Sequence, residues 1–485
     1  MNVVTRFPPS PTGFLHVGSL RTALYNYLFA RHHGGRFILR VEDTDRSRYV
    51  EGAVESLIRT MNVMGLDYDE GPTLVNDEIL EVGENGPYVQ SNRSEIYTKH
   101  VQQLIEQGDA YHCFCSKEHL AELRKTQQLA KLPTKYDRTC AGLSKDEIKT
   151  KMDAGEAFVI RLKIPEGPIT FKDEIRGSVT IDGSEVDDQV LMKADGFPTY
   201  HLAVVIDDHL MGVTHVIRGE EWISSVPKHV LLYQKLGFPL PVFAHLPLIL
   251  NPDKSKLSKR QGDVAVEDFL KKGYLPEALL NFVALLGFNP SGDQEIYTVK
   301  ELQDSFDLSS VNKSGAVFDV EKLNWMNGQY IKELEPTDLI DRVRPYTPNV
   351  DTDLLGKILA VEKDRLSFLS EITEHLDMYT QTPEYDSDIL VWKKADKEDA
   401  IKQLTGVGDL IKELTEEVFV SVELIEGAIK KYIGDNELQN GNVLWPMRVS
   451  LSGQGRSPSP FELAWILGKT ETTSRISRAI DKLVA

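Results

Sequence analysis

Cysteine is scarce in this chain of 485 residues, which has three: Cys113, Cys115 and Cys140. Three thiols cannot form the disulfide framework of a small secreted protein, so that class is excluded. Long apolar runs are absent too, because no unbroken stretch reaches the roughly 20 residues with which a helix crosses a bilayer. No signal-peptide pattern precedes the first strand pattern. We therefore expect a cytoplasmic protein that has no membrane partner.

Positive charge is also scarce. The chain has 55 Lys and Arg residues against 74 Asp and Glu residues, a formal net charge of −19. This excess does not exclude a nucleic-acid partner, because phosphate binding depends on a local basic face, while total charge mainly affects solubility and steering. Hydrophobic residues make up 41% of the chain, which is enough for ordinary cores. Its length predicts three or more domains.

The first motif is a loop of small residues between a predicted strand at residues 3–7 and a predicted helix. The loop reads SPTGFLHVGS at residues 10–19, and the apolar residues that follow have helical spacing. Unpaired N–H groups at the start of a helix favour an anion. His16 can donate to phosphate oxygens, and Gly18 lets a flat base approach the backbone. Alone, this pattern is also typical of an ordinary turn.

A second motif is the basic segment KSKLSKRQGD at residues 254–263. It follows an apolar run at residues 242–250 that predicts a strand. A charge run of this kind is usually a solvated surface. Here, however, one motif lies early and the other late in the same α/β pattern, so both can meet at the carboxyl ends of the strands. Together they predict a nucleotide-binding crevice.

Seven short blocks extend this pattern over nearly the whole chain. They are RFPPSPTG (6–13), HVGS (16–19), EDTD (42–45), FPTY (197–200), VIRGEE (216–221), KLSKR (256–260) and WMNG (325–328). With these blocks, in this order, the chain resembles the class I aminoacyl-tRNA synthetases, and among them the bacterial-type glutamyl-tRNA synthetases. HVGS and KLSKR depart from the class-wide signatures, as is usual in the glutamyl branch.

The resemblance implies an α/β Rossmann-type catalytic domain with an inserted α/β connective domain, followed by all-α anticodon-binding bundles. The expected boundaries are 1–110 and 196–262 for the two halves of the catalytic domain, 111–195 for the insertion that binds the tRNA acceptor end, 263–325 for a stem-contact domain, and 326–385 and 386–485 for the two bundles. Besides the strand at 242–250, we expect strands at 37–41, 158–162, 178–181, 200–207 and 214–218, and a helix around 54–61.

The reaction that the resemblance implies is adenylation followed by acyl transfer. Glutamate attacks the α-phosphorus of ATP, pyrophosphate leaves, and a terminal ribose hydroxyl of tRNA captures the activated carboxyl. Such chemistry depends on orientation and on positive groups placed where charge develops. The implied ATP-binding residues are Gly13, His16, Gly18, Lys256, Ser258, Lys259 and Arg260, of which His16, Gly18, Lys256 and Lys259 are the implied catalytic residues. Mg²⁺ bridges phosphate oxygens, and we assign it no protein ligand.

Glutamate carries two carboxylates and one ammonium group, so its site needs two cationic groups and acidic or hydroxyl partners. Arg6 and Arg218, each near the end of a predicted strand, suit planar carboxylates. Glu42 and Ser10 are expected to receive the amino group, and Tyr200 adds a hydroxyl. Isolated charged residues at strand ends usually form surface ion pairs. The family resemblance favours the binding role here.

Two arginines in the C-terminal part match anticodon-contacting positions of the family. Arg365 lies on a predicted apolar helical stripe formed by Leu354, Ile358, Val361, Leu369 and Ile372, where a hydrophobic residue is expected. An arginine whose head reaches solvent at the edge of that stripe is the alternative. Arg448 is the second candidate. Planar donors suit the open base edges of an unstacked loop.

The three cysteines allow a structural zinc site. Cys113, Cys115 and Cys140 could bind zinc together with Tyr136, an arrangement known in this family, because zinc requires four ligands. Three reduced, metal-free cysteines are the alternative. No zinc role in catalysis is expected.

The implied partners are L-glutamate, ATP and tRNA(Glu), with no DNA, and we expect a monomer. Three alternatives stay open. The enzyme could also glutamylate tRNA(Gln). A nucleotidyltransferase acting on a small metabolite would need neither the insertion nor the helical tail. A non-catalytic tRNA-binding regulator would have lost His16, Gly18, Lys256 or Lys259, all of which are present.

Overall fold

The computed structural model describes residues 2–257, 265–393 and 395–485. Three residues of the predicted ATP loop, Ser258, Lys259 and Arg260, lie outside the described residues. The chain divides into two compact units. One unit comprises Met1–Lys271 and Pro276–Leu323, and the other comprises Lys272–Leu275 and Asn324–Ala485.

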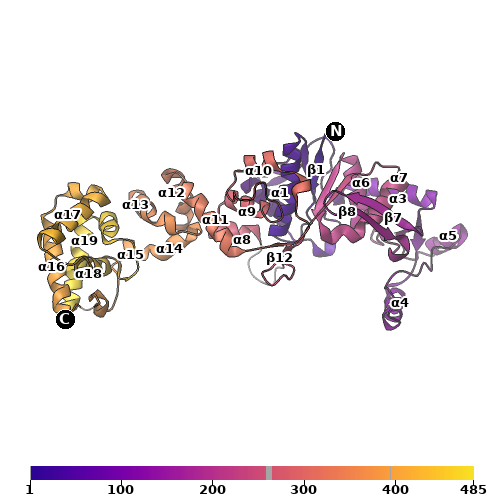
Figure 1. Ribbon diagram of the computed structural model, residues 1–485. Coiled ribbons are helices and arrows are strands. Elements are labelled where there is room, and N and C mark those ends of the chain that lie inside the picture. Colours follow the sequence, from indigo (N-terminus) through magenta and orange to yellow (C-terminus); the bar gives the residue numbers. More distant parts are fainter. Residues whose placement is uncertain (1, 258–264, 394) are drawn as a thin grey trace. The chain divides into compact units, whose positions relative to one another are not determined.

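The first unit contains the strands and a set of covering helices (Figure 1). Its strands are β1 (Val4–Phe7), β2 (Arg36–Leu39), β3 (Gly71–Val75), β4 (Glu78–Val82), β5 (Ala110–Cys113), β6 (Val159–Leu162), β7 (Pro168–Asp173), β8 (Gly177–Asp182), β9 (Val190–Met192), β10 (His215–Gly219), β11 (Val242–Leu246), β12 (Ile249–Leu250) and β13 (Ala316–Val317). Its helices are α1 (Val17–His32), α2 (Ala53–Val63), α3 (Ser94–Gln107), α4 (Lys117–Leu129), α5 (Lys145–Asp153), α6 (Tyr200–Leu210), α7 (Val226–Leu236), α8 (Val266–Lys272), α9 (Pro276–Ala284) and α10 (Val299–Ser305).

Parallel strands form the centre of this unit. β1 pairs with β2, and β10 pairs with β11, both in parallel register. The N–H of Thr214, directly before β10, donates to the carbonyl of Val4 (2.9 Å), which brings the start of β10 beside β1. All four residues of β1 are buried, as in a sheet covered on both faces. The carboxyl ends of these strands therefore open onto a common edge.

The inserted segment forms one sheet of its own and extends a second sheet that also contains β10 and β11. β5, β6 and β9 form an antiparallel sheet, and the β7–β8 hairpin joins β11 through the pair Phe243 and Asp173. Helix α4 buries none of its residues, and α5 begins with a capping box of Ser144 and Glu147. An α/β insertion was predicted here, and its strands at 159–162 and 177–182 match the predicted ones closely.

Two of the predicted strands differ from the structure. Residues 200–207 do not form a strand but lie in helix α6, with seven buried residues. The run 242–250 is not one strand, because β11 ends at Leu246 and β12 begins at Ile249, with Pro247 between them. Proline has no N–H to donate to a strand ladder.

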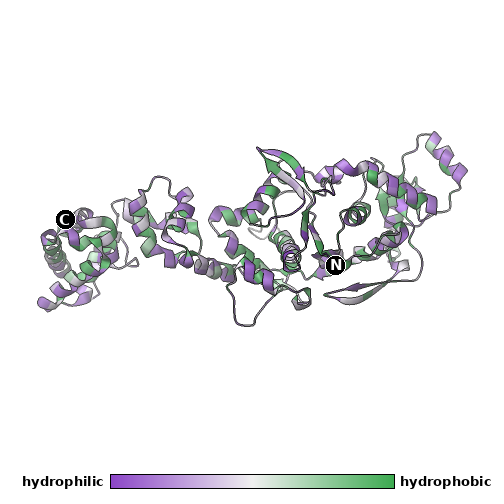
Figure 2. Ribbon diagram, turned by 90° about the horizontal axis from the view of Figure 1, so that it is seen from above, coloured by the Kyte–Doolittle hydropathy of each residue, from purple (hydrophilic) through white to green (hydrophobic). Residues whose placement is uncertain are grey.

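Beyond residue 320 the described chain consists of helices and short turns. They are α11 (Val320–Glu333), α12 (Pro336–Val343), α13 (Thr352–Glu362), α14 (Ile372–His375), α15 (Asp377–Thr380), α16 (Lys397–Glu413), α17 (Val422–Asp435), α18 (Asn440–Ser452) and α19 (Pro460–Val484). Helices α16, α17 and α18 pack on α19, which begins with a capping box of Ser459 and Glu462. The helices carry hydrophilic and hydrophobic residues side by side (Figure 2), as expected for elements with one buried face.

The prediction of one helical stripe that runs through Arg365 is also wrong. Helix α13 ends at Glu362, and residues 363–365 form a separate 3₁₀ turn. Leu369 and Ile372 are buried, but they belong to later elements. In the described part of the chain no helix has both the length and the apolar character required to span a membrane.

Candidate active site

A cleft of about 560 Å³ lies at the carboxyl ends of the parallel strands of the first unit. It is lined by residues at or just after the ends of β1, β2, β10 and β11 and by the start of α1. The predicted site residues among its lining are Arg6, Ser10, His16, Gly18, Glu42, Tyr200, Arg218 and Lys256. Gly13 is not among them, although it belongs to the same loop, where its φ of 132° favours glycine. The two sequence motifs thus meet in one cavity.

His16 is the N-cap residue of α1. Its Nδ1 accepts the N–H of Gly18 (3.0 Å), and its backbone carbonyl accepts the N–H groups of Ser19 and Leu20. In the neutral ring the proton must then lie on Nε2, because Nδ1 is an acceptor. The histidine therefore satisfies one N–H of the helix start and presents a donor nitrogen on its other side.

Gly18 and Lys256 both line the cleft. A Cβ atom at Gly18 would lie 3.2 Å from Nδ1 of His16, which is tighter than ordinary van der Waals contact. Lys256 is bridged to Leu250, and its carbonyl accepts the side-chain amide of Asn251 (3.3 Å). The lysine backbone is thus fixed beside β12, while its ammonium group can move on four carbons.

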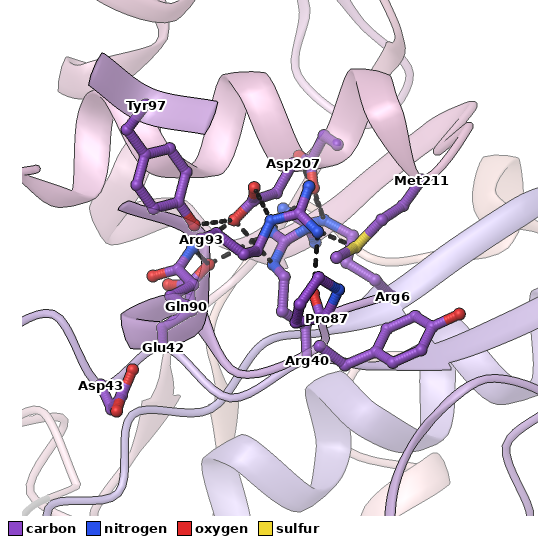
Figure 3. Close-up of polar contacts among 12 residues, drawn as sticks. Arg6, Arg40, Glu42, Asp43, Pro87, Gln90, Arg93, Tyr97, Asp207 and Met211 are labelled. Carbon is purple, nitrogen blue, oxygen red and sulfur yellow. Dashed lines mark hydrogen bonds and ion pairs between the residues drawn. The ribbon is translucent and has the colours of Figure 1, made fainter. Parts of the chain in front are cut away.

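Arg6 and Glu42 in the cleft lining belong to a buried cluster of charges (Figure 3). Arg6 is fully buried and its Nε donates to Asp208 (3.1 Å), while its Nη1 and Nη2 atoms are buried without a hydrogen-bond partner. Arg40 donates from Nη2 to the same Asp208 (2.8 Å) and to Glu42 (3.2 Å). Asp208 therefore holds two guanidinium groups, and Arg6 has donors left for a further acceptor.

A second acid extends this cluster away from the cleft. Asp207 accepts from Nε of Arg93 (2.7 Å), from the amide of Gln90 (2.8 Å) and from the hydroxyl of Tyr97 (2.8 Å). When Glu42 is ionised, the positive charges of Arg6, Arg40 and Arg93 balance the negative charges of Glu42, Asp207 and Asp208. Balance matters because an unpaired charge at this depth would be costly. Two adjacent acids in the otherwise apolar helix α6 are the feature of the sequence that indicates this cluster.

Glu42 borders the cleft although it is almost completely buried. Burial raises its pKa to about 7, against the opposing effect of the nearby Arg40 and Arg6. Its carboxyl group is therefore poised to change charge near neutral pH. A cationic group entering the cleft would favour the ionised form.

Arg218, at the end of β10, lies among neutral groups. It donates from Nη1 to the hydroxyl of Tyr200 (2.7 Å), from Nε to Nε2 of His245 (3.2 Å) and from Nη2 to Nδ1 of His229 (3.3 Å). The ring of Tyr200 packs on that of Trp222, with centroids 4.5 Å apart. Sequence reasoning missed both histidines, because a lone histidine in an apolar strand or helix carries no signal of its partner.

The three cysteines gather in the insertion. Their sulfur atoms all lie within 4.8 Å of one another, and Cys115 and Cys140 are 3.6 Å apart. The hydroxyl of Tyr136 lies 3.3 Å from the sulfur atoms of both Cys113 and Cys115. A tetrahedral zinc site with Zn–S bonds of about 2.3 Å separates its sulfur atoms by about 3.8 Å. The donor set therefore fits a structural zinc ion.

The two candidate anticodon residues belong to the second unit. Arg365 is 45% exposed, and its Nη1 lies 3.7 Å from a carboxylate oxygen of the buried Glu362. Glu362 also accepts from Nδ1 of His375 (2.9 Å) and from Tyr379. Arg448 lies in α18, and its Nε is buried without a hydrogen-bond partner. Arg365 is therefore an anchored, accessible cation.

The sequence matches two families of known proteins. Residues 2–325 match the family described as tRNA synthetases class I (E and Q), catalytic domain, and residues 338–480 match the anticodon binding domain. Among curated relatives, the glutamate–tRNA ligase of Alkaliphilus metalliredigens is 46% identical over 499 residues and covers both chains fully. That of Clostridioides difficile is 46% identical over 493 residues, covering 98% of this chain and 99% of the relative.

Solved structures agree with these relatives. A crystal structure of a glutamate tRNA ligase from Elizabethkingia meningosepticum in complex with its amino acid has a TM-score of 0.90, 35% identity and full coverage of both chains. The glutamate–tRNA synthetase of Elizabethkingia anophelis has a TM-score of 0.87 and 36% identity, covering 99% of this chain and all of that one. The family and the fold predicted from the seven blocks are thereby confirmed. This chain belongs to the class I tRNA synthetases for glutamate and glutamine, within the glutamate–tRNA ligase family.

Proposed function

We propose that this chain activates L-glutamate with ATP, releasing pyrophosphate, and transfers the glutamyl group to the terminal adenosine of tRNA(Glu). The observation that carries this proposal is the cleft itself, which combines a capped helix start with a buried arginine. The terminal nitrogens of Arg6 are buried without a partner, and a substrate carboxylate would supply the missing acceptors. Family membership supports the same reaction.

At the phosphate end, this chain supplies donors rather than covalent chemistry. The first turn of α1 and Nε2 of His16 face charge that grows on the α-phosphate as the carboxylate attacks. Lys256 adds a positive charge for the departing pyrophosphate, as Lys259 is expected to do from the part of the loop outside the described residues. Bound Mg²⁺ would neutralise phosphate charge, held mainly by phosphate oxygens and water.

At the amino-acid end, Arg6 and Arg218 are assigned to the two carboxylates of glutamate. Glu42 and the hydroxyl of Ser10 receive its ammonium group, and the hydroxyl of Tyr200 supports recognition beside Arg218. Two arginines and one acid match the charges of glutamate, whereas glutamine would leave one guanidinium without a charged partner.

The test of this proposal is aminoacylation of purified tRNA(Glu) and tRNA(Gln) with radioactive glutamate and ATP. Charging of tRNA(Glu) with release of pyrophosphate is the expected result, and no charging of either tRNA would refute the proposal. We also expect glutamate-dependent pyrophosphate exchange to require tRNA, as the family resemblance implies. Charging of both tRNAs would favour the non-discriminating alternative.

Glutamate binding is predicted to strengthen as the pH rises from 6 to 8. Glu42 must be ionised to pair with the substrate ammonium group, and its pKa of about 7 leaves it largely protonated at the lower pH. The KM for glutamate should therefore fall by roughly fivefold to tenfold across this range. Glu42→Gln should raise the KM and remove most of this dependence. A wild-type KM that stays constant with pH would contradict the assignment.

We propose that Arg365 reads an anticodon base. Its anchoring by Glu362 and its exposure leave donors that can reach an unstacked loop. Arg448 is a second, accessory candidate in α18. Arg365→Gln is predicted to reduce the preference for tRNA(Glu) over tRNA(Gln) about tenfold, the effect of one or two lost polar contacts. The ratio of kcat/KM for the two tRNAs measures it, and an unchanged ratio would argue against anticodon reading.

Zinc bound by Cys113, Cys115, Cys140 and Tyr136 is proposed as a structural element of the insertion. The guanidinium of Arg161 lies 4.0 Å from the ring centroid of Tyr136, a position that favours negative charge on a phenolate ligand. Because such ions contribute to folding directly, their loss should be seen as lost stability.

Removing the zinc ligand Cys140 is therefore predicted to release the metal. Cys140→Ser should lower the zinc content from about one ion per chain to near zero, because a closed structural site needs four ligands. Elemental analysis measures the metal, and thermal unfolding measures its effect on stability. A wild-type protein purified with zinc present that holds none would reject the site.

The assignments of location and assembly are proposals as well. We infer a cytoplasmic monomer, on the grounds of the sequence composition and of the substrates named above. Size-exclusion chromatography with light scattering tests the monomer.

A further inference from the structure

Arg218 is held in place by neutral side chains. Three of the five N–H groups of its guanidinium are used, by Tyr200, His229 and His245. Its partners in the described chain include no carboxylate, in contrast to Arg6, which pairs with Asp208. Its positive charge therefore stays available to a ligand in the cleft, while its orientation is fixed.

The hydrogen-bond directions determine the tautomer of each ring. Arginine can only donate, so Nδ1 of His229 and Nε2 of His245 are acceptors. The protons then lie on the opposite nitrogens, where His229 donates from Nε2 to Nδ1 of His201 (3.1 Å) and His245 donates from Nδ1 to Asp173 (2.6 Å). Each acceptor is thus supported by a second group behind it.

Resting on the proposed function above, we propose that His229 is a positioning residue for glutamate recognition, which acts by holding Arg218 as a neutral acceptor. It does not touch the substrate in this role. A carboxylate at the same place would hold the guanidinium equally well but would weaken its attraction for the substrate carboxylate, as Asp208 does at Arg6. A neutral imidazole fixes the arginine and leaves its charge intact.

The surroundings keep these rings neutral. Burial lowers the pKa of His229 well below its usual value, and the nearby Arg218, His201 and Lys228 lower it further. Burial likewise lowers the pKa of His201 to about 3. Protonation would place a second positive charge against Arg218 and remove the acceptor, so the neutral state is required for the contact.

The test compares two substitutions that differ in the acceptor. In His229→Asn the side-chain oxygen lies near the position of Nδ1 and can still accept from Arg218, whereas His229→Leu has a similar volume and no acceptor. We expect His229→Leu to raise the KM for glutamate about tenfold, with the KM for ATP changed by less than about twofold, as for the loss of one charge-assisted hydrogen bond. His229→Asn should recover most of this loss.

Aminoacylation of tRNA(Glu) provides the kinetic constants, and thermal unfolding of each variant provides the control. If His229→Leu fails to fold, His229→Gln replaces it. The amide group of glutamine lies at the level of Nε2, so this variant also lacks an acceptor at the position of Nδ1. An unchanged KM for glutamate in the variant without the acceptor overturns the proposal, and so does an equal rise in both variants. A wild-type chain that charges no tRNA would instead refute the proposed function, so the two failures are distinguishable.

Discussion

Replacement of Arg6 by glutamine is expected to reduce kcat/KM for glutamate by roughly a hundredfold to ten-thousandfold. Both terminal nitrogens of this guanidinium are buried in the lining of the cleft without a hydrogen-bond partner. A carboxylate bound there would accept two charge-assisted hydrogen bonds of about 1.5–3 kcal/mol each. Each 1.4 kcal/mol or so corresponds to a factor of ten in rate or affinity. Aminoacylation kinetics at varied glutamate concentrations measure the loss.

The substitution removes one of the two buried ion pairs of Asp208, while the pair with Arg40 at 2.8 Å remains, so thermal unfolding of each variant is measured beside its kinetics. Arg6→Lys is the matched control: it keeps the charge but loses the planar pair of donors, and should retain intermediate activity. The KM for ATP should stay near its wild-type value. Near-normal kcat/KM for glutamate in Arg6→Gln would show that the orphaned nitrogens do not bind the substrate.

The position of Arg6 could be predicted from the sequence because local pattern and topology agree there. A short β-branched strand with a charged residue next to its carboxyl end, in an α/β chain, places that residue at the edge where ligands bind. Arg218 lies next to the carboxyl end of β10 and Glu42 follows β2, and the structure brings all three to one cleft. Their roles stay predictions until kinetic tests.

The partners of these residues could not be predicted. Arg6 and Asp208 are separated by 202 positions in the sequence, and Arg218 and His245 by 27. Such pairs depend on which strands become neighbours and on how α6 packs, and neither follows from local periodicity. Tyr136, the candidate fourth zinc ligand, was predicted from the family resemblance alone, because the chain spacing of the thiols does not place it beside them.

Hydrophobic periodicity gave the wrong secondary structure where a helix and a strand have the same sequence pattern. The apolar run within 200–207 is short, and a buried strand and a buried helix segment look alike at that length. In the structure this segment is a helix, and α6 packs on α3 and α7 with seven of its residues buried. Around Arg365, the helical spacing continues in the sequence although α13 has ended at Glu362 and the chain turns in a 3₁₀ conformation.

His16→Asn is expected to lower kcat by about a hundredfold to a thousandfold, the cost of one lost donor that faces developing charge. Nδ1 of His16 accepts the N–H of Gly18, so the proton of the neutral ring lies on Nε2. Asparagine is a good N-cap residue and can still accept from Gly18, but its amide does not reach the position of Nε2. The substitution thus separates the capping role from the phosphate role, and kcat for pyrophosphate exchange in the presence of tRNA measures it.

His16→Gln provides the opposite case, because its longer amide can place an N–H near the position of Nε2 while the cap of α1 is lost. It should retain more activity than His16→Asn and show a lower thermal stability, by about 1 kcal/mol for a lost cap. If one of the two variants were both the more active and the more stable, this division of roles would be contradicted. If kcat for His16→Asn fell less than about threefold, far below the loss of a transition-state donor, His16 would have to be regarded as a capping residue alone. The anion site would then depend on the positive end of the α1 helix dipole and on Lys256.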